Sequence, residues 1–539
     1  MLFGELPVEE AEGAILAHSV KHAGGLFKKG RRLTADDIAT LRASGFASIF
    51  GARLSDGDVP EDEAAAAVAR VTGGVGTVAQ APFTGRANLH ASTHGLAIVD
   101  TERVRALNRL DESLTLATVQ PFAIVEDREM VATVKVIPFA VPRDVLEKAL
   151  AILASAPLLR VAAFRNKRVG LVITRLPQTK PSIITKSEDA MRERISALGG
   201  TLAEVQTVAH GVGEVAAAIA AMQALRCDPI LVFGASAIVD RGDVIPQALK
   251  KAGGRVIHLG MPVDPGNLMM FGALGEVPVI GVPSCARSPK LNGFDWVLAR
   301  VMAGVDVTRE DIMDMGAGGL LAEIPTRPSP REAKLKPQRA PRVTAIVLAA
   351  GKSSRMGANK LLADVNGAPM IRRTVAAISQ AVDETLVVTG RDREAIEGAL
   401  AGLSVRFAHN EEFANGLSTS LKRGIEAVGA DADAVVITLG DMPLVTPDTV
   451  RRLIAAYSPP EHRSICVPVS RGERGNPVLW GRQHFPALAG LEGDRGARVL
   501  FRTHSDEIVE VEILDESVLM DADTPEALER IRSAHSTGS

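Results

Sequence analysis

The run Ala434-Val435-Val436-Ile437 is apolar at every position, whereas a strand with one face in water alternates apolar and polar residues. A strand of this kind is buried on both faces, so its sheet must be covered by helices on both sides. Other short apolar runs alternate with helical patterns between residues 344 and 439. This alternation is typical of a parallel α/β sheet.

A second series of the same kind precedes the first. It begins with the apolar run at 168–173, passes through a helical segment that ends at Gly199-Gly200, and returns in the run at 229–233. Residues 1–160 lack this alternation and instead combine glycine-rich interruptions with a β-like run at 130–139. We therefore predict an α/β protein with two Rossmann-like three-layer parallel-sheet domains, preceded by an α+β N-terminal region.

A proline-rich, mostly basic stretch separates the two α/β series. Residues 325–342 contain no apolar period and are expected to form an extended linker, although their basic side chains could instead contact a phosphate ligand. The predicted parts are an N-terminal region at 1–160, an α/β domain at 161–324, the linker at 325–342 and a C-terminal domain at 343–539.

Composition excludes several classes of protein. The 539 residues include 61 basic and 64 acidic side chains, a net charge of -3, which provides no general attraction to nucleic acid or anionic membranes. The three cysteines are far apart, which argues against a disulfide framework or a zinc ribbon. No run of about 18 apolar residues and no signal-like segment is recognisable, so a cytoplasmic location is expected.

Glycines and cations follow the first strand of the C-terminal domain. Ligands of parallel sheets bind beyond the carboxyl ends of the strands, where glycine admits backbone N–H groups to a phosphate and Lys or Arg neutralises it. A P-loop is excluded because position 346, which would need glycine, is Ile346. The candidate loop residues are Leu348, Ala349, Ala350, Gly351, Lys352, Ser353, Arg355 and Lys360.

Two carboxylates follow later in the same domain. Asp441 comes directly after the buried strand at 434–439, and Asp523 precedes the last helical segment. Such carboxylates can hold Mg²⁺, which bridges protein oxygens to substrate phosphates. Each residue also has a simpler interpretation, Asp441 as a turn residue and Asp523 as a helix cap. The joint arrangement of cations and carboxylates favours a phosphate site.

The motif Leu-Ala-Ala-Gly-x-Ser-x-Arg-Met-Gly-x-x-Lys at 348–360, followed by Gly-Asp-Met-Pro at 440–443, resembles the nucleotidyltransferases of molybdenum cofactor maturation. The resemblance covers residues 343–535. The form with Ala350 is similar to the CTP-using branch of that family. The resemblance implies that Lys352, Arg355 and Lys360 hold the triphosphate and that Asp441 and Asp523 hold Mg²⁺. Residues Ser418, Thr419 and Ser420 are implied on the nucleoside side.

Residues 165–310 resemble the molybdopterin-binding domain of molybdopterin adenylyltransferases and molybdenum insertases. The resemblance rests on the loops at 233–246 and 281–293 and implies that Ser236, Asp240, Asp243 and Ser284 contact molybdopterin. Gly234-Ala235-Ser236 departs from the usual Gly-Gly-x-Ser of that family, so neither adenylyl transfer nor metal insertion is implied. A domain kept for packing or dimerisation is the alternative, and His210 is interpreted as a turn residue.

These resemblances together imply a Mg²⁺-dependent enzyme that transfers CMP from CTP to molybdopterin and releases pyrophosphate. The alternatives are a cytidylyltransferase for another small phosphorylated metabolite and a non-catalytic carrier or insertion protein for the molybdenum cofactor. The expected partners are small-molecule substrates, a molybdenum enzyme or its chaperone, and a second copy of the chain. Neither nucleic acid nor membrane is expected as a partner.

Overall fold

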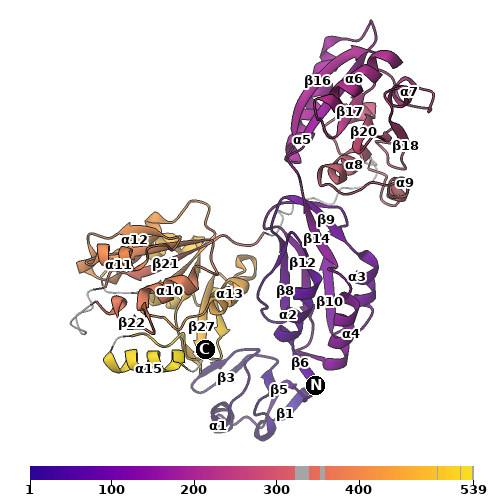
Figure 1. The fold of residues 1–539 in the computed structure, drawn as a ribbon. Coiled ribbons are helices and arrows are strands. Elements are labelled where there is room, and N and C mark those ends of the chain that lie inside the picture. Colours follow the sequence, from indigo (N-terminus) through magenta and orange to yellow (C-terminus); the bar gives the residue numbers. More distant parts are fainter. Residues whose placement is uncertain (322–338, 352–358, 494–495, 523, 537–539) are drawn as a thin grey trace.

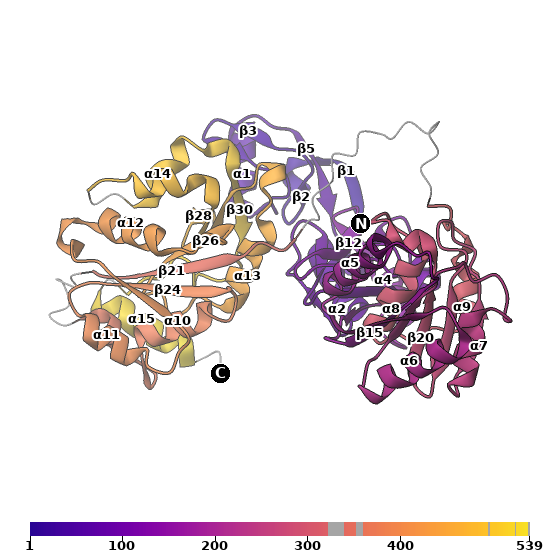
Figure 2. The same ribbon diagram turned by 90° about the horizontal axis from the view of Figure 1, so that it is seen from above.

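The computed structural model describes residues 1–321, 339–351, 359–493, 496–522 and 524–536. The chain forms three lobes, and the N-terminal region lies between two α/β lobes (Figures 1 and 2). The predicted α/β class is therefore confirmed, with an α+β region before the first α/β lobe.

The N-terminal region contains several small antiparallel sheets. One has the order β1-β5-β2, and two others have the orders β10-β12-β8-β7 and β11-β9-β14. Its strands are β1 (Leu2–Pro7), β2 (Ile15–Leu16), β3 (Val20–His22), β4 (Gly25–Phe27), β5 (Ser48–Arg53), β6 (Asp58–Pro60), β7 (Thr77–Ala79), β8 (Arg86–Ala91), β9 (Gly95–Val99), β10 (Leu114–Thr118), β11 (Ile124–Val125), β12 (Met130–Val136), β13 (Ala140–Pro142) and β14 (Leu159–Ala163). Its helices are α1 (Ala35–Ala43), α2 (Glu61–Thr72), α3 (Thr101–Asn108) and α4 (Arg143–Leu153).

The middle lobe contains a six-stranded sheet with the order β16-β15-β17-β20-β19-β18. The first four strands are parallel, whereas β19 is antiparallel to both of its neighbours. Gly275, with φ of 59°, lies in the two-residue turn that joins β19 to β20. The strands are β15 (Arg168–Arg175), β16 (Thr201–Ala209), β17 (Ile230–Phe233), β18 (Arg255–Leu259), β19 (Met270–Leu274) and β20 (Val277–Val282). The helices are α5 (Pro181–Ala197), α6 (Val212–Ala224), α7 (Val244–Lys251), α8 (Gly293–Met302) and α9 (Arg309–Met313).

The C-terminal lobe contains a larger mixed sheet with the order β25-β24-β21-β26-β29-β27-β28, and β30 pairs with β27. Strands β25, β24, β21 and β26 are parallel, and β29 is antiparallel to β26. The strands are β21 (Val343–Ala349), β22 (Asp364–Val365), β23 (Ala368–Pro369), β24 (Glu384–Thr389), β25 (Arg406–His409), β26 (Ala434–Leu439), β27 (Ile465–Ser470), β28 (Glu473–Arg474), β29 (Val478–Gly481) and β30 (Ile508–Glu512). The helices are α10 (Met370–Ile378), α11 (Arg393–Ala399), α12 (Leu417–Ala427), α13 (Pro447–Ala456), α14 (Phe485–Ala489) and α15 (Pro525–Ser536).

The position of β26 between two hydrophobic clusters explains why its sequence is apolar at every position. Ala434 and Val436 point into one hydrophobic cluster, whereas Val435 and Ile437 point into a second cluster on the other face of the sheet. Because successive strand residues face opposite sides, a strand between two cores must be apolar at every position.

The N-terminal region docks on the C-terminal lobe at the amino ends of its parallel strands. Arg128 forms an ion pair with Asp383, which precedes β24, at 2.5 Å and donates to the carbonyl oxygens of Ala340 and Pro341. Lys28 lies 3.6 Å from Glu510 of β30. These contacts place the opposite, carboxyl edge of the sheet away from the N-terminal region (Figure 1).

The end of the predicted linker takes part in this docking. Arg339 lies 2.9 Å from Asp433, and Arg342 lies 3.1 Å from Asp431. The basic side chains in the described part of this segment are therefore paired with acidic groups of the C-terminal lobe. Residues 322–338 lie outside the described residues.

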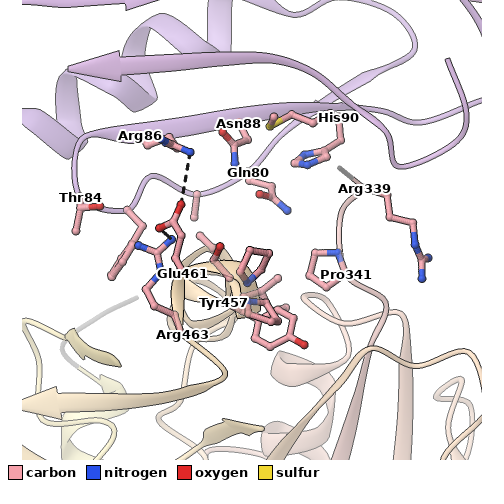
Figure 3. A pocket seen from close by; sticks show the side chains of 18 of the residues that line it. Gln80, Thr84, Arg86, Asn88, His90, Arg339, Pro341, Tyr457, Glu461 and Arg463 are labelled. Atoms are coloured by element: carbon pink, nitrogen blue, oxygen red, sulfur yellow. Dashed lines mark ion pairs between the residues drawn. The ribbon is translucent and has the colours of Figure 1, made fainter. Parts of the chain in front are cut away.

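A cleft of about 490 Å³ lies where the two parts meet (Figure 3). The β8 side chains of Arg86, Asn88 and His90 face it, while the intervening Ala87 and Leu89 are buried in the N-terminal core. Burial and, to a smaller extent, the nearby positive charge of Arg128 lower the pKa of His90 to about 4, so the imidazole is neutral at pH 7.

Arg86 reaches across this cleft to Glu461 of the C-terminal lobe at 4.0 Å (Figure 3). The guanidinium of Arg463 lies 5.2 Å from the ring centroid of Phe83, again across the cleft.

Among the described helices, none combines the length and the apolar composition that a membrane crossing requires.

Candidate active site

A second cleft, of about 570 Å³, opens at the carboxyl edge of the C-terminal sheet. It lies beyond the ends of β21 and β26, the position in which parallel α/β sheets bind their ligands. Its walls come from the end of β21, the short helix η4 (Lys360–Leu362), the turn before α12 with the start of that helix, the turn after β26 and the segment before α15. The lining residues are Leu348, Ala350, Gly351, Lys360, Leu361, Phe413, Ala414, Asn415, Gly416, Leu417, Ser420, Leu439, Gly440, Asp441 and Asp521.

Lys360 and Asp441 meet on the wall of this cleft. The Nζ atom of Lys360 lies 2.5 Å from Oδ2 of Asp441, and the two side chains are 19% and 6% exposed. Gly440 brings the turn after β26 close to α10, because a Cβ at this position would lie 2.6 Å from Cδ1 of Ile371. The backbone therefore places Asp441 deep in the site.

The other carboxylate oxygen of Asp441 suits a divalent cation. Oδ1 is buried and has no hydrogen-bond partner among the described residues, which is costly for a carboxylate unless a ligand completes its environment. The N–H group of Ala522 donates to the carbonyl oxygen of Asp441 at 3.3 Å, so the segment that leads to α15 lies beside it. Asp521 of this segment lines the same cleft. Carboxylate oxygens next to an open cleft are the donors that Mg²⁺ prefers.

The structure brings together several of the residues predicted for this site. Leu348, Ala350, Gly351, Lys360 and Asp441 line the cleft. Ala349 instead points into a hydrophobic cluster on the side of α10 and α11. Lys352, Ser353, Arg355 and Asp523 lie outside the described residues.

The three predicted hydroxyl residues of α12 differ in their surroundings. Ser418 donates to the carbonyl oxygen of Gly493 at 2.5 Å, and Thr419 donates to the carbonyl oxygen of Gly416 at 2.9 Å. Both hydroxyls thus hold the surrounding loops together. Ser420 lines the cleft and accepts a 2.9 Å hydrogen bond from Nδ2 of Asn410.

The sequence pattern did not single out Asn410, which is 4% exposed and contacts both Thr419 and Ser420. No local signal marks it, because its role depends on how β25 meets α12. In the wall formed by Phe413 to Leu417, Gly416 is the residue whose type reflects the local structure. It precedes α12 with φ of 113°, a backbone conformation that favours glycine.

In the middle lobe, His210 bridges two hydroxyl groups at the carboxyl edge of the sheet. Its Nδ1 atom lies 2.8 Å from the hydroxyl of Thr174, and its Nε2 atom lies 2.9 Å from that of Ser236. Burial lowers the pKa of His210, which keeps the ring neutral at pH 7. The interpretation as a simple turn residue missed this bridge, because Thr174 lies in β15, whereas His210 follows β16 and Ser236 follows β17.

The other residues predicted for molybdopterin lie on the same edge. Asp243 accepts from the N–H groups of Val239 and Asp240, which hold the pKa of its carboxyl below the usual range. The exposed Ser284 begins the turn after β20, next to the strand that Ser236 follows. The hydrogen bonds of both loops are internal to the lobe, and the assignment to molybdopterin stays a prediction.

Comparison with known proteins agrees with the C-terminal site. Residues 345–508 match the model of the MobA-like NTP transferase domain. Residues 5–53 match a domain of unknown function, DUF8806.

Purine catabolism protein PucB of Bacillus subtilis (strain 168) is 33% identical over 210 residues, which are 37% of this chain and 100% of PucB. Molybdenum cofactor cytidylyltransferase of Escherichia coli (strain K12) is 27% identical over 191 residues, 34% of this chain and 92% of the relative. A nucleotidyl transferase from Methanothermobacter thermautotroptrophicus of solved structure is 30% identical, with 37% and 99% of the two chains covered and a TM-score of 0.34.

The match to the NTP transferase domain and the similarity to the Escherichia coli cytidylyltransferase define the C-terminal lobe as a nucleotidyltransferase, and the protein is an enzyme. The cleft at the carboxyl edge of its mixed sheet is the candidate active site. Through residues 345–508 the chain belongs to the family of MobA-like NTP transferase domains.

Proposed function

We propose that the protein is a Mg²⁺-dependent molybdenum cofactor cytidylyltransferase, which transfers CMP from CTP to molybdopterin and releases pyrophosphate. The observation that carries the proposal is the Lys360–Asp441 pair, with its unpartnered carboxylate oxygen, on the wall of a cleft of about 570 Å³. The similarity to the Escherichia coli protein named molybdenum cofactor cytidylyltransferase supports the choice of acceptor and nucleotide.

The transfer is an in-line exchange at the α-phosphorus of CTP. A terminal phosphate oxygen of molybdopterin forms a bond to this phosphorus, and the bond to the oxygen that bridges the α- and β-phosphates breaks. Pyrophosphate leaves with the electron pair of that bond. No covalent enzyme intermediate is required, so the protein acts by positioning the partners and stabilising negative charge.

Lys360 contributes a positive charge on the wall of the cleft. Together with Lys352 and Arg355, it would hold the triphosphate and stabilise the departing pyrophosphate. Asp441 and Asp523 would hold Mg²⁺. When bound, this ion neutralises phosphate charge and so lowers the repulsion against an anionic attacking group.

Ala350 and Ser420 would contact the nucleoside part of CTP. Both line the cleft, and Ala350 is 5% exposed. A Cβ placed on Gly390 would lie 2.9 Å from the methyl group of Ala350, so the two residues are in close contact. This contact fixes the position of the methyl group, which narrows the space left for a base and favours cytosine over guanine.

The middle lobe would bind molybdopterin through Ser236, Asp240, Asp243 and Ser284, which lie in loops at the carboxyl edge of its sheet. The middle lobe meets the N-terminal region at the amino edge of its sheet, where Phe164 donates to the carbonyl oxygen of His94 at 3.2 Å. The two proposed ligand sites therefore lie at outer edges of their lobes (Figure 1). The module would raise the local concentration of molybdopterin rather than pass it directly between touching sites.

The decisive experiment incubates the full chain with molybdopterin and CTP, GTP or ATP in turn and measures released pyrophosphate. We expect CTP to give the fastest turnover. A parallel assay offers sugar phosphates as acceptors, because transfer to another small phosphorylated metabolite is the alternative activity. Turnover with a sugar phosphate but not with molybdopterin would overturn the proposed acceptor, and molybdopterin binding without turnover would favour a carrier.

A further inference from the structure

We propose that His484, His504 and Glu507 form a second metal site, which binds one transition-metal dication and fits Zn²⁺ best. The three residues lie in the C-terminal lobe, in the turns η7 (Arg482–His484) and η9 (Ser505–Glu507) and just before η9. One ligand atom from each residue lies within 4.8 Å of the others. Two imidazoles and one carboxylate are a ligand set typical of zinc.

The distances within this His–His–Glu cluster suit a single ion. Nε2 of His484 lies 3.4 Å from Oε2 of Glu507, and Nδ1 of His504 lies 3.5 Å from Oε1 of Glu507. Zinc binds nitrogen and oxygen at about 2.0–2.2 Å in tetrahedral sites, so neighbouring ligand atoms lie about 3.3–3.6 Å apart. The two histidines approach different oxygens of Glu507, and the three ligand atoms, which lie within 4.8 Å of one another, would move closer together around a bound ion.

The surrounding structure holds the three ligands in place. The N–H group of Ser464 donates to the carbonyl oxygen of Glu507 at 3.1 Å, and the N–H group of Gly481 donates to the carbonyl oxygen of Ser464 at 2.8 Å. These bonds tie η7 and η9 to the start of β27. The ring of Trp480 packs edge-on against His484, with centroids 5.9 Å apart, and so limits rotation of the imidazole. Such support is what a preorganised metal site requires.

The three side chains differ in their exposure to solvent, and the more exposed ones leave an ion a path into the cluster. The side chain of His484 is 2% exposed, whereas those of His504 and Glu507 are 29% and 32% exposed. An ion can enter from the His504 side, and water can supply a fourth ligand.

A hydrogen-bond network without metal is the alternative for these residues. The hydroxyl of Ser464 lies 2.8 Å from Nε2 of His484 and donates to Oε2 of Glu507 at 2.5 Å, and Gln483 also donates to that oxygen at 3.3 Å. This network accounts for Ser464, His484 and Glu507. His504 joins it only through Nδ1, which faces the Glu507 carboxylate at 3.5 Å and gives the cluster a third ligand.

The proposed zinc site is separate from the nucleotidyltransferase cleft. Gly481, which precedes η7, pairs with Ala434 at the start of β26, whereas Asp441 follows the end of that strand. The ion would link β27, η7 and η9 at the edge opposite the cleft. Its role would be to stabilise this end of the sheet, independently of nucleotide transfer.

The test measures Zn²⁺ binding to the full-length protein by isothermal titration calorimetry after removal of metals with a chelator. The Asp441→Asn variant serves as background, so that the other candidate metal site does not contribute. We expect one Zn²⁺ per chain. His504→Ala should weaken binding by more than the about 10–100-fold that loss of an outer-shell partner costs. Glu507→Gln should weaken it comparably, because it keeps the shape but removes the charge.

His462→Asn provides the matched control, because it removes an exposed histidine of the same lobe at a left-handed position, with φ of 56°, that asparagine tolerates. It should leave binding unchanged. Substitution of Co²⁺ should give the visible absorption of a four-coordinate site in the background protein but not in His504→Ala, with circular dichroism as the check on folding. Absence of stoichiometric Zn²⁺ binding, or equal affinity in His504→Ala, would overturn the site and leave the hydrogen-bond network.

Discussion

Nζ of Lys360 lies 2.5 Å from Oδ2 of Asp441, although the two residues follow different strands, β21 and β26, which are neighbours in the sheet. The pair stabilises a buried carboxylate whose second oxygen has no hydrogen-bond partner in the part of the chain that the structure describes. A bound triphosphate would compete with Asp441 for Lys360, and a bound metal ion would compete with Lys360 for Asp441.

Asp441→Asn should leave the fold intact and lower CMP transfer by at least about 100-fold, because the amide holds a divalent cation poorly and loses charge where the phosphates need it neutralised. Pyrophosphate release at limiting Mg²⁺ measures the loss. Asp448→Asn removes an exposed carboxylate from the first turn of α13 and should retain full activity. Near wild-type transfer by Asp441→Asn would contradict the metal role.

Lys360→Met should destabilise the protein by about 3 kcal/mol, because it leaves the buried Asp441 carboxylate without its cation. The double variant Lys360→Met/Asp441→Asn should recover most of this loss, since no buried charge remains. Thermal unfolding of the wild type, the two single variants and the double variant provides the measurement. If the effects of the two substitutions were simply additive, the pair would not be coupled in the way that the geometry indicates.

Ala350→Gly should raise the kcat/KM of GTP relative to that of CTP, because the methyl group that narrows the base side of the cleft is lost. We expect a change in the CTP to GTP ratio of about tenfold, the lower end of what one methyl group contributes in a pocket. Steady-state pyrophosphate release with each nucleotide gives the ratio. An unchanged ratio would assign nucleotide choice to other residues.

Glu61→Gln should change the pH dependence of stability. Burial of Glu61, next to Asp62, raises the pKa of its carboxyl to about 7, from an ordinary value near 4.5. The folded protein thus favours the protonated acid, and stability should fall as pH rises from 4.5 through 7. The glutamine variant should be more stable at pH 8 by about 1–2 kcal/mol, a figure reduced for partial exposure.

Chemical unfolding of both proteins from pH 5 to pH 8 tests this effect. Glu63→Gln is the matched control, because it removes an exposed carboxylate from the same first turn of α2 and so tests the helix dipole alone. A parallel shift of Glu61→Gln and Glu63→Gln across the whole pH range would show that burial of Glu61 is not the cause.

The part of the chain before the linker at 325–342 and the part after it should stay associated when the linker is cut. A protease site inserted between residues 325 and 335 allows the cut, and the halves should elute together at low salt because Arg128 and Arg86 still bridge them. Arg128→Ala should weaken the association by about tenfold, as expected for loss of hydrogen bonds to a charged group. High salt should weaken it further.

Arg105→Ala provides the control for this experiment, because Arg105 is exposed on α3 and forms an ion pair with Glu102 of the same helix. Complete separation of the halves at low salt, in the wild-type background, would contradict the docking contacts. Size-exclusion chromatography and ultracentrifugation distinguish the two results.

The class of fold could be predicted because burial on both faces leaves a local record in the sequence. Each residue of β26 reports its own surroundings, so four consecutive apolar residues reveal a covered strand. The antiparallel direction of β29 and β19 left no local pattern in the sequence, because the direction of a strand depends on which neighbour it pairs with. The candidate positions after β21 and β26 were also visible locally, as glycines, cations and a carboxylate at strand ends.

By itself, then, the sequence determined the α/β class, the two layered lobes and the segments that form the nucleotidyltransferase cleft, since each leaves a pattern within about ten neighbouring residues. Only the tertiary structure decided that Lys360 pairs with Asp441, that His210 joins Thr174 to Ser236, and that the N-terminal region docks on the C-terminal lobe. Likewise, His484 meets His504 and Glu507 only through the pairing of β27 with β29 and β30. Such contacts join residues from separate elements, and their formation depends on how whole sheets and helices pack.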